Sequence, residues 1–328
     1  MPRAVALFSG GLDSMLAVRL MQEQGIEVDA LYVQTLFRCC KAQAAQAAAE
    51  LGVRLLVHFA GEDYLELIRR PAHGYGKGAN PCVDCRIFMA RVARQCMDQL
   101  GACVVVTGEV LGQREMSQKR IDLDRIARQS GLEDRLLRPL SARLLAPTLP
   151  ERLGQIDRSK LCAFSGRGRR ELIALARRLG IGTTAGPSSG CRLAEAHFAV
   201  RVRDLLVHHP AATRWQFELL AVGRHARIDA STRIVVGRNA DDNAALERLF
   251  ERQDAEPGAL LIPADFPGPS VLVAGGRAPL ALELAGALML RYSKFEGPHH
   301  AHLRRGRLDA AELLAIRPRE AANEPSWL

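Results

Sequence analysis

Short apolar runs alternate with stretches of helical periodicity through the first third of the chain. The apolar runs predict buried strands at residues 4–8, 28–35, 54–60 and 103–107. The stretches between them predict helices at residues 13–24, 42–51, 63–69 and 85–100. Strands separated by helices form a parallel sheet, because each crossover is right-handed. This part of the chain therefore predicts an α/β fold with a doubly wound parallel sheet, in which ligands bind at the carboxyl ends of the strands.

The pattern weakens after residue 108, and the composition changes near residues 192–198. Further strands are predicted at residues 200–207, 233–236, 260–262 and 270–273. Further helices are predicted at residues 168–179, 214–222 and 279–292. The mixed order indicates a second, smaller α+β domain. We expect one domain at residues 1–194, a second at 195–297, and a basic, partly ordered C-terminal tail at 298–328.

Composition and charge narrow the choice of environment and partner. Apolar residues make up 48% of the chain, which is enough for a sizeable core. No apolar run approaches the ~20 residues that a membrane span needs, and the N-terminus lacks the pattern of a secretory signal. We therefore expect a cytoplasmic protein without membrane contact. The formal net charge of +9 favours a polyanion such as RNA as partner, although arginines on an ordinary solvated surface would give the same charge.

The segment between the first strand and the first helix reads Ser-Gly-Gly-Leu-Asp-Ser at residues 9–14. Gly10 and Gly11 let the backbone turn tightly and approach an anion closely, and amides at a helix N-terminus attract negative charge. Ser9 and Ser14 add hydroxyl donors, and Asp13 offers a carboxylate to Mg²⁺. Together these features predict a cradle for a pyrophosphate group.

This loop has no Gly-Lys-Ser/Thr ending of the Walker A type and resembles the PP-loop of the ATP pyrophosphatases, whose fold is adenine nucleotide alpha hydrolase-like. The resemblance implies that Asp13 holds Mg²⁺ and that the five named loop residues contact the phosphates of ATP. It also implies an adenine site at the ends of neighbouring strands, at Gln34 and Gly108. Enzymes of this family cleave ATP between the α- and β-phosphates and adenylate a carbonyl oxygen.

Three of the eight cysteines stand in sequences typical of loops. Cys82 and Cys85 form a Cys-x-x-Cys pair between a proline and a predicted helix, and Cys191 follows a Ser-Ser-Gly run. Three interpretations stay open. The thiolates ligate a [4Fe–4S] cluster, or they act without metal as a persulfide nucleophile and its disulfide partner, or with His73 they hold a structural zinc.

Residues 107–113 read Thr-Gly-Glu-Val-Leu-Gly-Gln, and Ser-Gln at 117–118 and Arg-Pro-Leu at 138–140 follow. This stretch resembles the catalytic domain of tRNA 4-thiouridine synthetases, and the cysteine pattern resembles iron–sulfur-dependent tRNA thiolases. The resemblance implies that Gly108, Gln113 and Gln118 belong to the nucleotide site and that the three cysteines ligate a [4Fe–4S] cluster. Arg86, or alternatively Arg91, is then placed to stabilise phosphate charge during transfer, unless both lie on a solvated helix face.

The second half carries Gly-Arg-Asn-Ala at residues 237–240, with Asn243 after it and Gly-Pro-Ser at 268–270. This pattern resembles the NFACT-R module, which implies RNA binding. Basic side chains in and beside the match would contact RNA phosphates. We expect these contacts from Arg203, Arg224, Arg227, Arg238 and Lys294.

These observations together predict an ATP-dependent sulfurtransferase. It would adenylate a nucleobase carbonyl oxygen in tRNA or another RNA and replace that oxygen with sulfur from sulfide or a persulfide carrier. Two alternatives are a PP-loop amide-forming ligase that adenylates a small molecule, and a non-catalytic RNA-binding factor.

Overall fold

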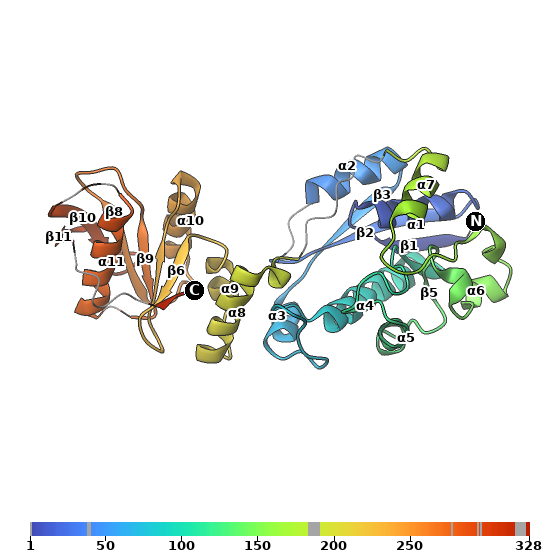
Figure 1. Cartoon of the computed structure of the whole chain (residues 1–328), viewed down its shortest axis with the longest axis horizontal. Helices are drawn as coiled ribbons and strands as arrows, with labels where there is room; N and C mark the ends of the chain where they lie inside the picture. Colours follow the sequence, from blue (N-terminus) through green and yellow to red (C-terminus); the bar gives the residue numbers. More distant parts are fainter. Residues whose placement is uncertain are drawn as a thin grey trace. The chain divides into compact units, whose positions relative to one another are not determined.

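The computed structural model describes residues 2–37, 41–182, 191–276, 278–293, 295, 297–318 and 326–328. Cys39, Cys40, residues 188–190 and the predicted RNA contact Lys294 lie outside the described residues. The chain divides into two compact units, Met1–Ala194 and Glu195–Leu328, which are coloured blue to green and yellow to red in Figure 1.

A parallel sheet organises the first unit. Its described strands are β1 (Arg3–Leu7), β2 (Glu27–Gln34), β3 (Arg54–Phe59), β4 (Val104–Thr107) and β5 (Leu136–Leu137). They lie in the order β3-β2-β1-β4-β5, and each neighbouring pair is parallel. The order reverses between β1 and β4, which is where doubly wound sheets bind their ligands. The predicted α/β fold is confirmed.

Helices cover both faces of this sheet because alternate strand residues point to opposite faces. Ala4 and Ala6 of β1 pack with α1 (Leu12–Gln22), α2 (Lys41–Leu51) and α7 (Arg170–Arg178), whereas Val5 packs with α4 (Cys82–Leu100) and α5 (Arg120–Gln129). The remaining helices are α3 (Glu62–Arg69), α6 (Leu149–Arg152) and three 3₁₀ turns at Ala142–Leu144, Arg158–Lys160 and Arg192–Ala194.

The start of α4 differs from the prediction. Its first residue is Cys82, three residues earlier than expected, and Pro81 is the N-cap. A proline is tolerated just outside a helix because the first amides lack intrahelical partners. The Cys-x-x-Cys pair therefore forms the first turn of the helix and not the loop before it.

An antiparallel sheet organises the second unit. Its described strands are β6 (Arg224–Arg227), β7 (Arg233–Val236), β8 (Gly258–Pro263), β9 (Val271–Ala274), β10 (His299–Arg304), β11 (Glu312–Ile316) and β12 (Ser326–Trp327). The helices are α8 (Ala196–His208), α9 (Arg214–Leu219), α10 (Ala240–Phe250) and α11 (Pro279–Arg291). Ile234 and Val236 face the core that contains α11, and Val235 faces the core that contains α9 and α10. The predicted α+β domain is confirmed.

Two predictions in this unit are wrong. Residues 200–207 lie in helix α8 and not in a strand, because the buried residues Phe198, Val202 and Leu205 follow helical spacing despite the β-branched residues between them. Residues 298–328 are not a separate tail, because β10, β11 and β12 belong to the sheet. In β10 the buried Ala301 and Leu303 alternate with more exposed side chains, which is the pattern of a strand with one buried face.

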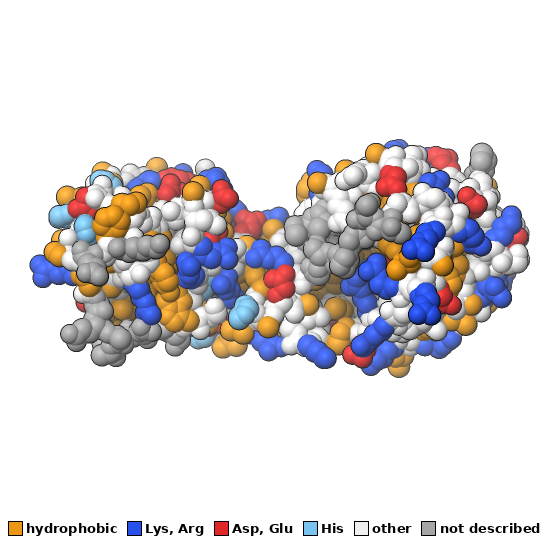
Figure 2. Space-filling view, turned by 45° about the horizontal axis from the view of Figure 1, so that its top comes forward, with side chains coloured by type: hydrophobic (Ala, Val, Ile, Leu, Met, Phe, Trp, Pro, Cys, Tyr) orange, Lys and Arg blue, Asp and Glu red, His pale blue; other side chains and the backbone are white. Residues whose placement is uncertain are grey.

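The visible surface of both units is polar. Figure 2 shows Lys and Arg side chains scattered over it together with Asp and Glu, with apolar side chains between them. Within the described ranges, the helices are all too short or too polar to cross a bilayer.

Candidate functional site

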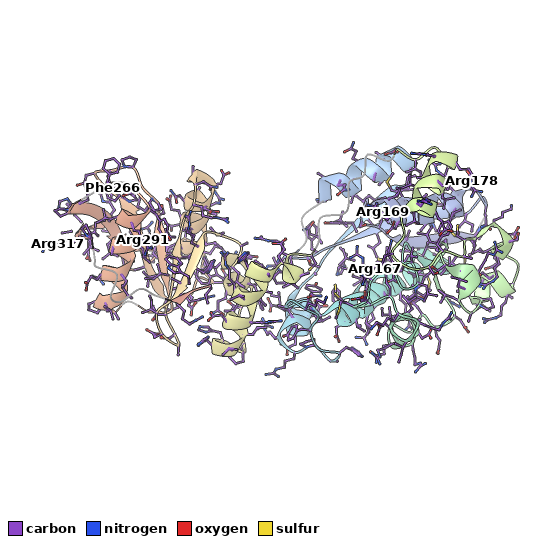
Figure 3. All side chains as sticks on the ribbon, in the orientation of Figure 1. Arg167, Arg169, Arg178, Phe266, Arg291 and Arg317 are labelled. Atoms are coloured by element: carbon purple, nitrogen blue, oxygen red, sulfur yellow. The ribbon has the colours of Figure 1, made fainter. Side chains whose placement is uncertain are left out.

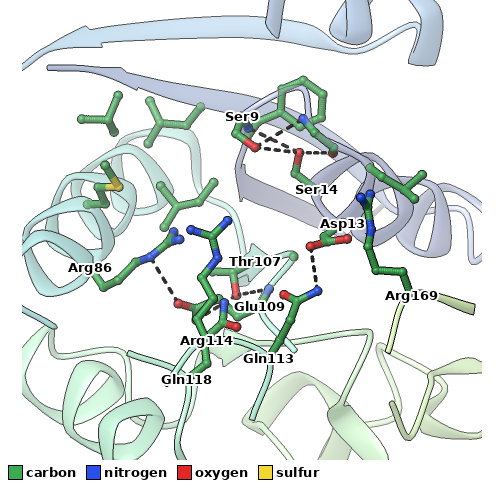
Figure 4. A pocket seen from close by; sticks show the side chains of 18 of the residues that line it. Ser9, Asp13, Ser14, Arg86, Thr107, Glu109, Gln113, Arg114, Gln118 and Arg169 are labelled. Atoms are coloured by element: carbon green, nitrogen blue, oxygen red, sulfur yellow. Dashed lines mark hydrogen bonds and ion pairs between the residues drawn. The ribbon is translucent and has the colours of Figure 1, made fainter. Parts of the chain in front are cut away.

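A pocket of about 360 Å³ lies at the carboxyl edge of the parallel sheet, where the strand order reverses (Figure 4). This volume falls within the range of small-molecule sites. Residues from β1, α1, β2, α4, β4 and two later segments line it: Leu7, Phe8, Ser9, Gly11, Leu12, Asp13, Ser14, Leu31, Val33, Arg86, Met89, Thr107, Gly108, Glu109, Gln113, Arg114, Gln118, Arg167 and Arg169.

The Ser9–Ser14 turn forms one wall of the pocket. The Ser14 hydroxyl donates to the Gly11 carbonyl at 2.7 Å, and the Gly11 amide points to the Ser9 hydroxyl at 3.3 Å. Gly10 has φ +73°, and a Cβ there would lie 2.8 Å from Cα of Ala44. Gly10 therefore shapes the turn through its backbone and lies behind the pocket wall.

The end of β4 packs directly onto this turn. A Cβ on Gly108 would lie 2.5 Å from the backbone carbon of Asp13. Only glycine allows so close an approach of two backbones. The contact explains why a glycine follows β4 and why both chain segments reach the same pocket.

A buried ion-pair network lies at the base of the pocket. Arg138 Nε is 3.0 Å from one Glu109 oxygen, and Arg86 Nε is 3.6 Å from the other. Burial by itself would raise the pKa of Glu109, but the charges of Arg138 and Arg86 outweigh it and hold that pKa below its usual value. Glu109 thereby fixes Arg86 against the pocket with its charge partly offset.

Two glutamines bring further polar groups into the pocket. Gln113 Nε2 donates to Asp13 Oδ2 at 3.2 Å, which orients the carboxylate (Figure 4). Gln118 is 2% exposed, and its buried side-chain oxygen has no hydrogen-bond partner among the described residues. Buried polar atoms are normally satisfied, so this oxygen is available to accept a bond from a ligand.

Most of the residues predicted for ATP binding line this pocket. Gln34 does not line it, and its amide donates to the Thr35 carbonyl at 3.3 Å. Sequence reasoning missed Glu109, Arg167 and Arg169. The Thr-Gly-Glu stretch was a signal for Glu109, but no local motif marked the two arginines.

The three predicted cysteines lie near a shared tyrosine. The Tyr64 hydroxyl is 3.3 Å from Cys85 Sγ. Burial chiefly raises the pKa of Tyr64, and the charges of Cys85 and then Cys191 raise it further, so both sulfurs lie within electrostatic reach of the hydroxyl. Asn80 Nδ2 donates to Cys82 Sγ at 3.0 Å.

Backbone contacts hold the Cys191 segment in this place. The Ala79 amide donates to the Leu193 carbonyl at 2.8 Å, and the Arg192 amide donates to the Phe37 carbonyl at 3.2 Å. The loop before Cys82 and the residues after Cys191 are therefore joined directly.

The cysteines as they stand do not form a metal site. Over the described ranges, no three His, Cys, Asp or Glu side chains gather closely enough to hold an ion. His73 Nδ1 lies 2.9 Å from Asp84 Oδ1, so this ring is already engaged. Burial raises the pKa of the Cys96, Cys103 and Cys162 thiols, which makes them poor nucleophiles.

The second unit corrects one predicted RNA contact. Arg227 is 8% exposed and donates to both carboxylate oxygens of Asp204, at 2.7 and 2.5 Å, so it supports the fold and is not a phosphate contact. Arg203 is exposed, the Arg224 guanidinium lies 4.6 Å from the Tyr292 ring centre, and Arg238 is half-exposed beside Asp242 at 2.6 Å.

Comparison with known families gives two matches. Residues 2–142 match the family described as thiamine biosynthesis protein (ThiI), and residues 223–326 match the family described as NFACT protein RNA binding domain. The second match includes β10 and β11, in agreement with the structure.

Curated relatives match parts of the chain. A tRNA sulfurtransferase of Desulfurococcus amylolyticus is 27% identical over 79% of this chain and 48% of its own length. The tRNA-specific 2-thiouridylase MnmA of Acidithiobacillus ferrooxidans is 33% identical over 32% of this chain and 33% of its own length. The chain thus spans about a third to a half of the length of these relatives.

Two solved structures share part of the fold. One is a 4-thiouridine synthetase–RNA complex with bound ATP (20% identity, 55% of this chain and 51% of that chain, TM-score 0.36). The other is a predicted subunit of a tRNA methyltransferase from Methanocaldococcus jannaschii (16% identity, 54% and 76%, TM-score 0.37). By its family matches, its parallel sheet and its Ser9–Ser14 turn, this chain combines a ThiI-type PP-loop domain with an NFACT-type RNA-binding domain.

Proposed function

We propose that this protein is an ATP-dependent RNA sulfurtransferase. It adenylates a carbonyl oxygen of a nucleobase in tRNA or another RNA and replaces that oxygen with sulfur. Relatives named tRNA sulfurtransferase and tRNA-specific 2-thiouridylase support this proposal, as does the pocket at the PP-loop.

One face of helix α4 carries the proposal. Cys82, Cys85, Arg86 and Met89 are three or four residues apart, so they share that face. Arg86 and Met89 line the nucleotide pocket, and the two sulfurs lie about one helical turn, ~5 Å, before them. A base whose carbonyl oxygen meets ATP in the pocket is therefore near the thiols.

The first chemical step is adenylation. Asp13 would hold Mg²⁺ beside the phosphates, since Mg²⁺ sites often use one carboxylate and substrate oxygens, and the metal would neutralise phosphate charge. The Gln118 oxygen is placed to accept a hydrogen bond from the adenine amino group. The nucleobase oxygen attacks the α-phosphorus, the bond to the bridging oxygen breaks, and pyrophosphate leaves with the electron pair. The loop amides and Arg86 stabilise the developing charge.

The second step exchanges oxygen for sulfur. A sulfur nucleophile derived from sulfide or a persulfide carrier attacks the activated carbon, and AMP leaves with the former carbonyl oxygen. In this proposal Cys82, Cys85 and Cys191 carry the sulfur or hold a [4Fe–4S] cluster that supplies it. No step is routed through a cluster, because the described side chains do not meet in a metal site.

The second unit would hold the RNA. Arg203, Arg224 and Arg238 offer guanidinium groups at its surface, and Lys294 stays a predicted contact outside the described residues. Phosphate contacts of this kind position a nucleic acid without reading its sequence.

Two variants separate the steps. Asp13→Asn should abolish RNA-dependent pyrophosphate release and leave RNA binding unchanged. Cys191→Ser should release pyrophosphate yet form no thionucleoside, measured by mass spectrometry of digested RNA. Cys103→Ser is the matched control, because its sulfur lies 3.3 Å from the Arg3 carbonyl, at the opposite edge of the sheet.

Full thiolation by Cys191→Ser would refute the role of the cysteines. Pyrophosphate release without RNA, but with a small carboxylic acid and an amine, would favour the amide-forming ligase. Iron content and visible absorbance of protein prepared without oxygen decide whether a cluster is held.

A further inference from the structure

Two arginines line the nucleotide pocket from outside the stretch that matches the ThiI family. Arg167 and Arg169 belong to the segment before α7, whereas the family match ends at residue 142. Figure 3 labels both on this segment, together with Arg178 in the last turn of α7. They were not marked by any motif, yet they contribute two of the four arginines among the lining residues of this pocket.

The backbone fixes this segment against the nucleotide site. The Gly166 amide donates to the Leu111 carbonyl at 2.7 Å, and Leu111 and Ser165 form a parallel bridge. A Cβ on Gly112 would be 3.6 Å from the Gly166 nitrogen, so two glycines meet where the segments touch. This contact holds residues 167–169 at the pocket mouth.

The charges around the pocket differ in how far they are offset. Arg86 lies 3.6 Å from Glu109, and Arg167 pairs with Glu115. Arg169 is exposed, and within the described ranges no hydrogen bond or ion pair engages its side chain. Figure 4 shows Arg169 on the same side of the pocket as Asp13, with Arg86 and Arg114 on the other side. An uncompensated guanidinium in a pocket is a site for an anion.

We propose that Arg169, assisted by Arg167, binds the β- and γ-phosphates of ATP and stabilises the departing pyrophosphate. This assignment rests on the proposed function and adds the residues that distinguish ATP from AMP. When the bond between the α-phosphorus and the bridging oxygen breaks, the electron pair and a negative charge move to pyrophosphate. Guanidinium groups offset that charge through paired hydrogen bonds.

Calorimetric titration with Mg²⁺ and α,β-methylene-ATP tests this assignment, because the methylene group prevents cleavage. Charge-assisted hydrogen bonds contribute enough that Arg169→Ala should weaken α,β-methylene-ATP binding about 10–100-fold. AMP binding should change less than about threefold, because AMP lacks the groups that Arg169 contacts. Arg169→Lys should recover part of the loss. Arg178→Ala is the control, since Arg178 is an exposed arginine of the same helix that does not line the pocket.

The outcomes separate this assignment from the proposed function. Wild-type binding of α,β-methylene-ATP that Arg169→Ala leaves unchanged would overturn the assignment alone. Equal weakening of AMP and α,β-methylene-ATP would also overturn it, as would a loss confined to RNA affinity. A wild-type protein that binds neither nucleotide would overturn the proposed function as well.

Discussion

Replacement of Glu109 by glutamine removes the carboxylate that Arg138 and Arg86 share beneath the nucleotide pocket. Glu109 and Arg138 are 3% and 5% exposed, and their charged atoms are 3.0 Å apart. Removal of one partner of a buried pair costs about 3–5 kcal/mol, because the other charge stays buried without compensation. We expect Glu109→Gln to lower the free energy of unfolding of the first unit by this amount, a large part of the about 5–15 kcal/mol typical of a domain.

The two tryptophans make this effect measurable. Trp215 and Trp327 both belong to the second unit, so tryptophan fluorescence follows that unit and far-ultraviolet circular dichroism follows both. In urea, the variant should move the first-unit transition in the dichroism signal to a midpoint about 1–2 M lower. The fluorescence transition should keep its midpoint.

Acid pH and a double variant sharpen the test. The pKa of Glu109 is lowered in the folded state, so its contribution to stability is complete above the unfolded-state pKa of about 4.3 and is lost as the pH falls through the folded value. The difference between wild type and Glu109→Gln should therefore be full at neutral pH and shrink in acid. Glu109→Leu combined with Arg138→Met should recover most of the loss, since both charges are gone. A single variant as stable as the double one would refute the reasoning.

Three further predictions concern other contacts. Gly108→Ala should weaken ATP binding about 5–150-fold by calorimetry, because its Cβ would collide with the Asp13 backbone; unchanged affinity would contradict the packing described here. Asp204→Asn should lower the free energy of unfolding of the second unit by about 3–5 kcal/mol, measured by tryptophan fluorescence, because it leaves Arg227 buried and unpaired; a shift under about 1 kcal/mol would show that the pair is dispensable. Burial, followed by the charges of two nearby arginines, holds the pKa of His225 well below its usual value. The unfolded state then gains the proton first, so the stability of the second unit should fall as the pH drops below about 6.5, and His225→Gln should flatten this slope.

The sequence predicts best what local pattern and motif control together. The Ser9–Ser14 turn was recognisable because glycines, hydroxyls and a carboxylate directly follow an apolar run, and the structure places the turn where the strand order reverses. The parallel sheet follows from the same alternation of strands and helices. Residues 200–207 misled because Val200, Val202 and Val207 favour a strand locally, whereas packing of the unit selects a helix. The strand β10 was missed because charged and histidine side chains on its exposed face hide the buried Ala301 and Leu303.

The candidate site was predictable only in part, since its members come from distant segments. Glu109 lies within a recognised stretch, but its partner Arg138 is 29 residues away and the pairing has no local signature. Arg167 and Arg169 reach the pocket through the contact between Gly112 and Gly166. Such contacts depend on how segments cross in three dimensions, which periodicity along one segment does not encode.

The bridge between Leu111 and Ser165 has a consequence for the order in which the protein matures on the ribosome. The Ser9–Ser14 turn is translated among the first residues, but the last arginine of the pocket is residue 169. At the usual pace of translation, the interval between them is on the order of ten seconds. During that time the nascent chain carries an incomplete cradle, so tight nucleotide capture becomes available only when most of the first unit has emerged.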